Sequence, residues 1–154
     1  MKRDLISIRD LTRGEIEGFF DLATDLKQRL HQKMPHPLLP GRTLALIFEK
    51  PSLRTRVTFE VAMTQLGGHA IYLAPQDIRL GARETVEDAA KNLSRWVDGI
   101  VARTFEHGTV ERLAQDATVP VINGLTDLTH PCQALSDLFT LKEKRGNLGG
   151  LRIA

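Results

Sequence analysis

The stretch FEKPSLRTRVTFE, residues 48–60, passes from an apolar run into a helical pattern by way of Pro51 and Ser52. The apolar run, residues 44–48, ends at the first residue of this stretch. Its unbroken apolar character is typical of a strand buried on both faces. Ser52 has the residue type and the position of a helix N-cap, and Gly67 supplies the C-terminal stop. A buried strand that leads directly into a capped helix is the repeating unit of a parallel α/β fold.

The same alternation of strand and helix repeats along the chain. Apolar runs predict four strands, at residues 44–48, 69–73, 99–102 and 118–122. Helical spacing predicts helices at residues 13–31, 54–66, 84–97, 106–115 and 130–144. A capping box of Thr12 and Glu15 opens the first helix, Trp96 belongs to the inner face of the third, and residues 74–83 read as a polar loop. The pattern predicts an α/β fold, a three-layer domain whose four-stranded parallel sheet is flanked by helices.

Composition limits the class of protein. The 154 residues are 42% hydrophobic, which is enough for one globular domain with a sizeable core. The net charge is only +2 and the lysines and arginines form no block, which argues against a nucleic-acid or membrane partner. The single cysteine, Cys132, excludes an internal disulfide and a cysteine-rich zinc site. Since no signal peptide or bilayer-spanning run is evident, we expect a soluble, cytoplasmic protein.

The C-terminal residues predict the start of a second domain. RGNLGG, residues 145–150, has the composition of a flexible connector, and LRIA, residues 151–154, has the look of a strand that stops as soon as it starts. We therefore expect one domain over residues 1–148 and, at residues 149–154, the beginning of a truncated second domain.

Polar residues follow every predicted strand. Because ligands of open α/β sheets bind outside the carboxyl ends of the strands, these residues form the candidate site. They are Ser52, Arg54 and Thr55 after the first strand, Arg79 after the second, Arg103 after the third, and His130 and Gln133 after the fourth. Taken alone, residues 48–60 favour a plain helix cap with solvated arginines. The convergence of cations from separate strands on a helix N-terminus favours a phosphate site instead.

Other chemistries lack their motifs. The sequence has no G-x-G-x-x-G after the first strand, no G-x-x-x-x-G-K-[ST] and no H-E-x-x-H, so dinucleotide, P-loop and zinc-protease functions have no support. Cys132 is close to His130 in sequence, but neighbouring side chains diverge near a helix start and no third group orients them, which argues against covalent catalysis.

Three blocks of sequence carry a family resemblance. They are SLRTR with FE within residues 52–60, VDGI leading to RTF within residues 97–105, and NGLTD leading to HPCQ within residues 123–133. In this order and spacing they resemble the aspartate/ornithine carbamoyltransferase family. The resemblance covers essentially the whole chain and is to the N-terminal, carbamoyl-phosphate-binding half of these enzymes. Cys132 stands where aspartate-specific members usually have threonine, which favours ornithine as the acceptor.

The resemblance implies a site and a reaction. The phosphate would be bound by Ser52, the backbone of Leu53, Arg54 and Thr55, with Arg103 bridging phosphate and carbonyl. His130 and Gln133 would hold the carbamoyl group, and Pro131 and Cys132 complete that binding segment. The implied catalytic residues are Arg54, Thr55, Arg103 and His130. The reaction would transfer the carbamoyl group of carbamoyl phosphate to L-ornithine, giving L-citrulline and phosphate, with no metal and no organic cofactor.

Two residues depart from the family pattern. Leu53 stands where threonine is common, and since its backbone N–H is the expected donor, we expect binding to survive. Arg79 stands where ornithine-specific members usually carry a glutamine that reaches the neighbouring subunit's phosphate, and we keep it in the substrate-binding set. Arg56 is assigned instead to a structural pair with Glu60 at i,i+4 spacing.

The resemblance also implies partners and leaves alternatives open. It implies a homotrimer and a second domain that binds ornithine, so this half alone should turn over little or nothing. The expected setting is arginine biosynthesis in the cytoplasm, but both directions of the reaction use the same residues, so an anabolic and a catabolic enzyme stay open. One alternative is another carbamoyltransferase, with aspartate or an acylated ornithine as the acceptor. The other is a non-catalytic phosphate-binding module.

Overall fold

Four parallel strands form the centre of the computed structural model, which describes residues 2–81 and 83–152. β1 (Thr43–Phe48) lies between β2 (His69–Leu73) and β3 (Gly99–Arg103), and β4 (Val121–Leu125) completes the order β2-β1-β3-β4. Every neighbouring pair of strands is parallel. The predicted four-stranded parallel sheet is therefore confirmed.

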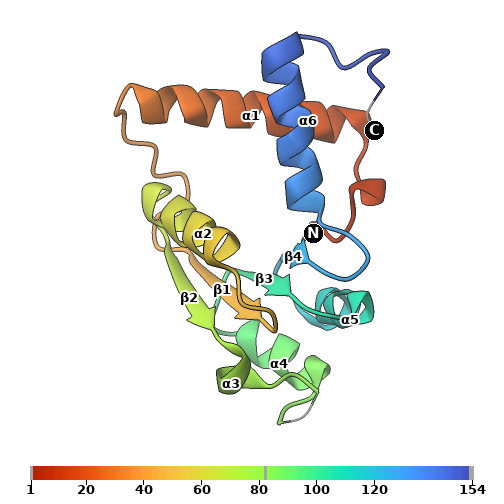
Figure 1. Cartoon of the computed structure of the whole chain (residues 1–154). Helices are drawn as coiled ribbons and strands as arrows, with labels where there is room; N and C mark the ends of the chain where they lie inside the picture. The colour runs from red at the N-terminus through yellow and green to blue at the C-terminus, as the bar shows by residue number, and fades with distance from the viewer. Residues whose placement is uncertain (1, 82, 153–154) are drawn as a thin grey trace.

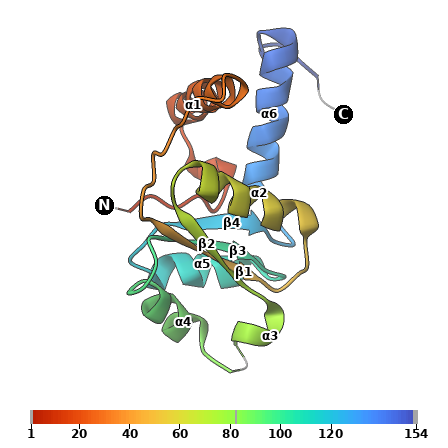
Figure 2. The same ribbon diagram turned by 90° about the vertical axis from the view of Figure 1, so that its left-hand side faces the viewer.

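Helices cover both faces of this sheet (Figure 1). Figure 2 shows α1 (Arg13–His31), α2 (Leu53–Gln65) and α6 (Pro131–Arg145) on one side, with α3 (Pro75–Ile78), α4 (Val86–Leu93) and α5 (His107–Asp116) on the other. The three predicted layers are thus present. Across residues 2–81 and 83–152, no helix combines the length and the apolar character needed to cross a membrane.

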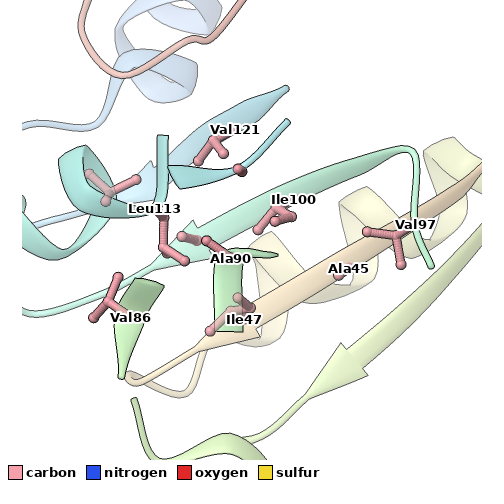
Figure 3. Close-up of a cluster of buried hydrophobic side chains, with 11 residues drawn as sticks. Ala45, Ile47, Val86, Ala90, Val97, Ile100, Leu113 and Val121 are labelled. Atoms are coloured by element: carbon pink, nitrogen blue, oxygen red, sulfur yellow. The ribbon is translucent and has the colours of Figure 1, made fainter. Parts of the chain in front are cut away.

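The main core lies between the sheet and the helices α4 and α5 (Figure 3). Ile47 and Ile100 from the central strands pack in one cluster with Ala90 of α4 and Leu113 of α5, and all four side chains are fully buried. The alternate strand positions form a second buried cluster on the opposite face, at Leu46, Phe48 and Val101. Because both faces of β1 and β3 are covered, these strands read as unbroken apolar runs in the sequence.

Local sequence signals set the start and the end of the long helices. The Thr12 hydroxyl accepts the N–H of Glu15, and the Glu15 carboxylate accepts the N–H of Thr12 at 2.7 Å, which is the predicted capping box. Ser52 caps α2 in the same way, with its hydroxyl accepting the N–H of Thr55. After α2, Gly67 takes a φ of 81°, and a Cβ there would come within 2.9 Å of Pro37. Only glycine fits that turn without strain.

The prediction for the fourth strand is wrong by three residues. β4 runs from Val121 to Leu125, whereas the apolar pattern placed the strand at residues 118–122. Pro120 has no N–H to give to the ladder, so pairing begins after it. The strand then continues through Asn123, a polar residue that is fully buried and that a search for apolar runs does not include.

Two further predictions need correction, and one lies partly outside the described residues. α4 ends at Leu93, and Trp96 is 72% exposed and so does not lie on the inner face. The predicted polar loop contains the one-turn helix α3, which is stabilised because the Asp77 carboxylate accepts the N–H of Ala74 at 2.8 Å. At the C-terminus, residues 151–152 form no strand, and residues 153–154 lie outside the described residues.

The N-terminal segment pairs with the outer edge of β4. Leu5 donates its N–H to the Val121 carbonyl at 2.9 Å, and its own carbonyl accepts the N–H of Asn123 at 2.8 Å. The Asp4 carboxylate accepts the N–H of Val121 at 2.8 Å. These bonds satisfy backbone groups that an edge strand would otherwise leave open, and they bring residues 4–6 next to Asn123.

Candidate functional site

A hollow of about 510 Å³ opens at the carboxyl ends of β1, β3 and β4. It receives side chains from the start of α2, the end of β3 and the segment between β4 and α6. The lining residues are Ser52, Arg54, Thr55, Thr58, Phe59, Arg103, Leu125, His130, Cys132, Gln133 and Ser136. The described structure therefore brings together seven of the ten predicted site residues in one cavity.

The N-terminus of α2 forms one wall of this hollow. Ser52 is its N-cap, and the Ser52 hydroxyl accepts the N–H of Thr55 at 3.3 Å and donates to the Thr55 hydroxyl at 3.0 Å. The first N–H groups of a helix have no intrahelical acceptor, and together with the helix dipole they attract an anion. The first turn of α2 contains no acidic residue that would offset this attraction.

Arg103, at the end of β3, brings a second guanidinium into the same space. Its Nε atom is buried and has no hydrogen-bond partner within the described residues. Burial, and then the nearby charge of Arg54, lower the pKa of the Arg103 guanidinium from its ordinary value. Two cations that destabilise each other, in a hollow with no acidic lining residue among those described, favour a bound anion.

His130, the N-cap residue of α6, faces the same excess of positive charge. Burial is the main cause that lowers the pKa of its imidazole, the charge of Arg103 lowers it further, and Asp137 acts in the opposite direction. The neutral imidazole is therefore favoured near pH 7. Its Nδ1 atom is also buried without a partner in the described part of the chain, so the ring has bonding capacity left for a ligand.

A network of buried hydrogen bonds holds the segment that leads to His130. The Asn123 amide donates to the Ile6 carbonyl at 3.0 Å and to the Thr129 carbonyl at 3.4 Å, while its oxygen accepts the N–H of Leu125 at 2.9 Å. The φ of Leu125 is 152°, a strained value for a residue with a side chain. Asn123 thus joins the N-terminal segment, β4 and the loop before α6.

A second anchor for the same loop comes from α5. The His107 ring pairs through Nδ1 with the Thr126 hydroxyl at 2.9 Å, and the Asp127 carboxylate accepts the N–H of His107 at 3.1 Å. Thr126 is almost fully buried and its hydroxyl also accepts the N–H of Thr129 at 3.2 Å. The position of His130 is therefore set by bonds to distant parts of the chain.

Cys132 lines the hollow as a protonated thiol. Burial raises its pKa to about 11, so the thiolate is scarce near pH 7. The Sγ atom lies 3.6 Å from the Asn123 carbonyl, to which it donates. This environment agrees with the expectation from the sequence that Cys132 is not a nucleophile.

Three predicted residues do not place their side chains in the hollow. Leu53 is 79% exposed and points into solvent, which leaves only its backbone for a ligand. Pro131 is fully buried in the first turn of α6. Arg79 lies beyond β2 in a left-handed conformation and lines a separate hollow of about 290 Å³ beside Phe105.

Four lining residues are not among the site residues that the sequence predicts. Thr58 and Phe59 lie one helical turn after Arg54 and Thr55, so the i,i+4 rule would have indicated them. Ser136 stands in the same relation to Cys132, whereas Leu125 carries no signal because it is an apolar residue after a strand. They are Thr58, Phe59, Leu125 and Ser136.

Arg56 is in the motif but serves the structure. Its Nε atom donates to the Glu60 carboxylate at 2.9 Å, as the i,i+4 spacing predicts. Its guanidinium lies 3.8 Å from the centre of the Tyr72 ring on β2. Arg56 thus fastens α2 to the sheet and leaves Arg54 to face the hollow.

Comparison with known proteins places this site in a family. The chain matches the model of the aspartate/ornithine carbamoyltransferase, carbamoyl-P binding domain over residues 3–143. It is 53% identical to the ornithine carbamoyltransferase of Anoxybacillus flavithermus, over 99% of this chain and 48% of that protein. The ornithine carbamoyltransferase from Pyrococcus furiosus superposes with a TM-score of 0.95 and 54% identity, over 97% of this chain and 48% of that one.

A more distant relative has the same fold. The catalytic subunit of M. jannaschii aspartate transcarbamoylase superposes with a TM-score of 0.88 and 35% identity, over 98% of this chain and 50% of that one. The chain thus spans about half the length of the relatives that it matches. By sequence, structure and the composition of its cavity, the chain belongs to the aspartate/ornithine carbamoyltransferase family, and it matches the carbamoyl-phosphate-binding domain of that family.

Proposed function

We propose that this chain binds carbamoyl phosphate as one half of an ornithine carbamoyltransferase, and that the half of the relatives beyond the match supplies the ornithine site. The observation that carries the proposal is the presence of Arg54 and Arg103 in one hollow at the N-terminus of α2, where the buried Nε atom of Arg103 has no partner among the described residues. Relatives that are 53–54% identical to this chain are named for ornithine, which supports ornithine as the acceptor.

In this proposal the phosphate binds at the α2 N-terminus. Ser52, Thr55, Arg54 and the backbone N–H of Leu53 hold its oxygens, and Arg103 reaches both the phosphate and the carbonyl oxygen. His130 and Gln133 contact the carbamoyl group from the α6 side. The Nε atom of Arg103 and the Nδ1 atom of His130, which have no hydrogen-bond partner among the described residues, support these roles.

The chemistry then follows from where charge develops. The δ-amine of ornithine attacks the carbamoyl carbon and forms the new C–N bond, so negative charge gathers on the carbonyl oxygen. The C–O bond to phosphate breaks next, the electron pair leaves with the phosphate, and the amine loses a proton. Arg54, Arg103 and the neutral His130 donate hydrogen bonds to those oxygens, which lowers the barrier without a metal or organic cofactor.

The assembly and its setting are part of the same proposal. Leu53, Val57 and Val61 follow one another at intervals of four residues on α2, and all three leave apolar side chains exposed on one side of that helix. An exposed apolar patch of this kind supports a subunit interface, in keeping with a cytoplasmic homotrimer. Through that interface Arg79 would approach a neighbouring subunit. A role in arginine biosynthesis is supported by the name of the Pyrococcus furiosus relative, an anabolic enzyme.

Calorimetric titration of the 154-residue chain with carbamoyl phosphate tests the proposal. We expect saturable binding with one site per chain, displaced by inorganic phosphate. Citrulline formation is measured on a chimera that joins this chain to the second half of the Pyrococcus furiosus relative. In that chimera Arg54→Ala should lower turnover by about a hundredfold or more, because it removes a donor to the developing charge. Absence of binding to a folded chain, or undiminished turnover by Arg54→Ala, would refute the proposal.

A further inference from the structure

Gln133 and Asp137 lie one turn apart on α6 and are hydrogen bonded. The Nε2 atom of Gln133 donates to the Asp137 carboxylate at 2.8 Å. An ionised carboxylate only accepts hydrogen bonds. A flip of the Gln133 amide would therefore place its Oε1 atom against a carboxylate oxygen of Asp137, and the two would repel each other. Asp137 therefore fixes which end of the Gln133 amide is used internally, and the carbonyl oxygen Oε1 accepts no hydrogen bond from the described residues.

The Oε1 atom of Gln133 is a hydrogen-bond acceptor in surroundings that are rich in donors. Gln133 lines the hollow, where Arg54 and Arg103 offer donors and where no acidic side chain is among the described lining residues. The Ser52 and Thr55 hydroxyls are already bonded to each other. The other side-chain oxygens that line the hollow belong to hydroxyls, which are weaker hydrogen-bond acceptors than an amide oxygen.

A carbamoyl group needs one such acceptor. Its carbonyl oxygen accepts hydrogen bonds, but its NH₂ group donates them, and a donor that loses water on binding without gaining an acceptor weakens the complex. An acetyl group has the same shape with a methyl group in place of NH₂, and makes no such demand. The orientation of Gln133 therefore decides whether the hollow distinguishes these two groups.

We propose that Asp137 is a positioning residue that holds Gln133 with its oxygen toward the ligand, and thereby makes the hollow select a carbamoyl phosphate over an acyl phosphate. The proposal rests on the proposed function and goes beyond it by naming what sets the selectivity. Asp137 is exposed and does not line the hollow, so it acts through Gln133 and has no direct contact with the cavity.

Two further features support this assignment. An exposed i,i+4 pair contributes little to helix stability, so stability alone gives little reason for this pair. The Asp137 carboxylate is also close enough to the other ligand-facing group of α6 to raise the pKa of His130 against the effect of Arg103. The carboxylate thus influences both side chains that face the carbamoyl end of the hollow.

The test compares three ligands on the 154-residue chain by calorimetry: carbamoyl phosphate, acetyl phosphate and inorganic phosphate. Asp137→Ala should reduce the preference for carbamoyl over acetyl phosphate by about three- to tenfold, the effect of one hydrogen bond, and should change inorganic phosphate binding by less than about twofold. Asp137→Asn should lie between, because its amide can pair with Gln133 in either orientation.

A double-mutant cycle separates positioning from a general effect. In a Gln133→Ala background the preference should already be lost, and Asp137→Ala should change it no further. Glu87→Gln is the matched control, since it also removes a carboxylate from an exposed i,i+4 pair, here with Lys91 on α4. Thermal unfolding confirms that each variant is folded.

The outcomes distinguish this inference from the proposed function. If the unmodified chain binds no carbamoyl phosphate, the proposed function fails. If it does bind, but Asp137→Ala leaves the preference unchanged or weakens all three ligands equally, the positioning role of Asp137 is overturned and the proposed function stands.

Discussion

The two walls of the hollow are built in different ways. The α2 wall uses a local device, in which Ser52 caps the helix and Arg54 and Thr55 follow within one turn. The α6 wall depends on Asn123 and on the loop from Leu125 to His130, which is tied to the N-terminal segment and to α5. The α2 wall should keep its shape when bonds elsewhere in the fold are removed, whereas the α6 wall should lose its shape when a bond to a distant segment is removed.

The largest expected effect is a loss of stability when the α6 wall is altered. Asn123→Ala leaves the Ile6 carbonyl and the N–H of Leu125 without their partners and opens a small cavity, so we expect the free energy of unfolding to fall by about 2–4 kcal/mol. Ser52→Ala removes only one cap and should lower it by about 1 kcal/mol. Urea unfolding of both variants measures the difference, and equal losses would contradict the distinction between the walls.

The next effect concerns Arg103, the residue that both walls share. Arg103→Met keeps the length of the side chain and removes its charge, so phosphate binding should weaken by about ten- to a hundredfold, the range for a hydrogen bond to a charged group. The ligand-free chain should at the same time become more stable, because the repulsion between Arg103 and Arg54 disappears. Calorimetry and thermal unfolding check the two parts. Unchanged binding, or a less stable ligand-free chain, would contradict the role of Arg103 as an unpaired cation.

A smaller effect is expected from pH, and it belongs to the α6 wall. The pKa of His130 is lower in the folded chain than its ordinary value of 6.5, so the unfolded chain takes up a proton first as the pH falls. The contribution of neutral His130 to stability is therefore present above that ordinary pKa and is lost as the pH falls through the folded pKa. Compared with His130→Asn, the unmodified chain should lose more stability between about pH 7.5 and about pH 5. Saturating phosphate should reduce this excess, since a bound anion favours the charged imidazole; identical pH profiles of the two chains would contradict the assignment.

The smallest effect is expected at Leu53. Its side chain is 79% exposed and only its N–H faces the anion in the proposed site, so Leu53→Thr should leave phosphate affinity within about twofold. Threonine is the informative replacement because it changes the side chain alone, whereas glycine would also loosen the backbone of the first helical turn. A large change in the dissociation constant would mean that the side chain takes part in binding.

The same contrast explains what the sequence could predict. Ser52, Arg54 and Thr55 were predictable because a cap, a helix dipole and two arginines act within a few residues of each other. The convergence with Arg103 and His130 was predictable from the rule that parallel strands end at one edge. Asn123 belongs to the NGLTD block, but its role in holding the loop was not predictable, because its bond to Ile6 spans 117 residues.

The errors in the fold have the same origin. The apolar pattern places β4 three residues early because the half of the strand that contains Asn123 is stabilised by tertiary bonds to Leu5 and Ile6, which no apolar pattern reveals. Trp96 was assigned to the interior because helical spacing was extended beyond Leu93, where the helix ends. Whether Arg79 reaches a neighbouring subunit depends on an assembly, so it stays a prediction.

The most direct test of the account is a crystal structure of the chain with carbamoyl phosphate. The account predicts the phosphate at the N-terminus of α2, in contact with Ser52, Arg54 and Thr55. It also predicts Arg103 between phosphate and carbonyl, and the carbamoyl nitrogen within hydrogen-bond distance of the Gln133 oxygen. A ligand bound in another cavity, or one whose phosphate lies on the α6 side of the hollow, would contradict the claim that the two walls form a single carbamoyl phosphate site.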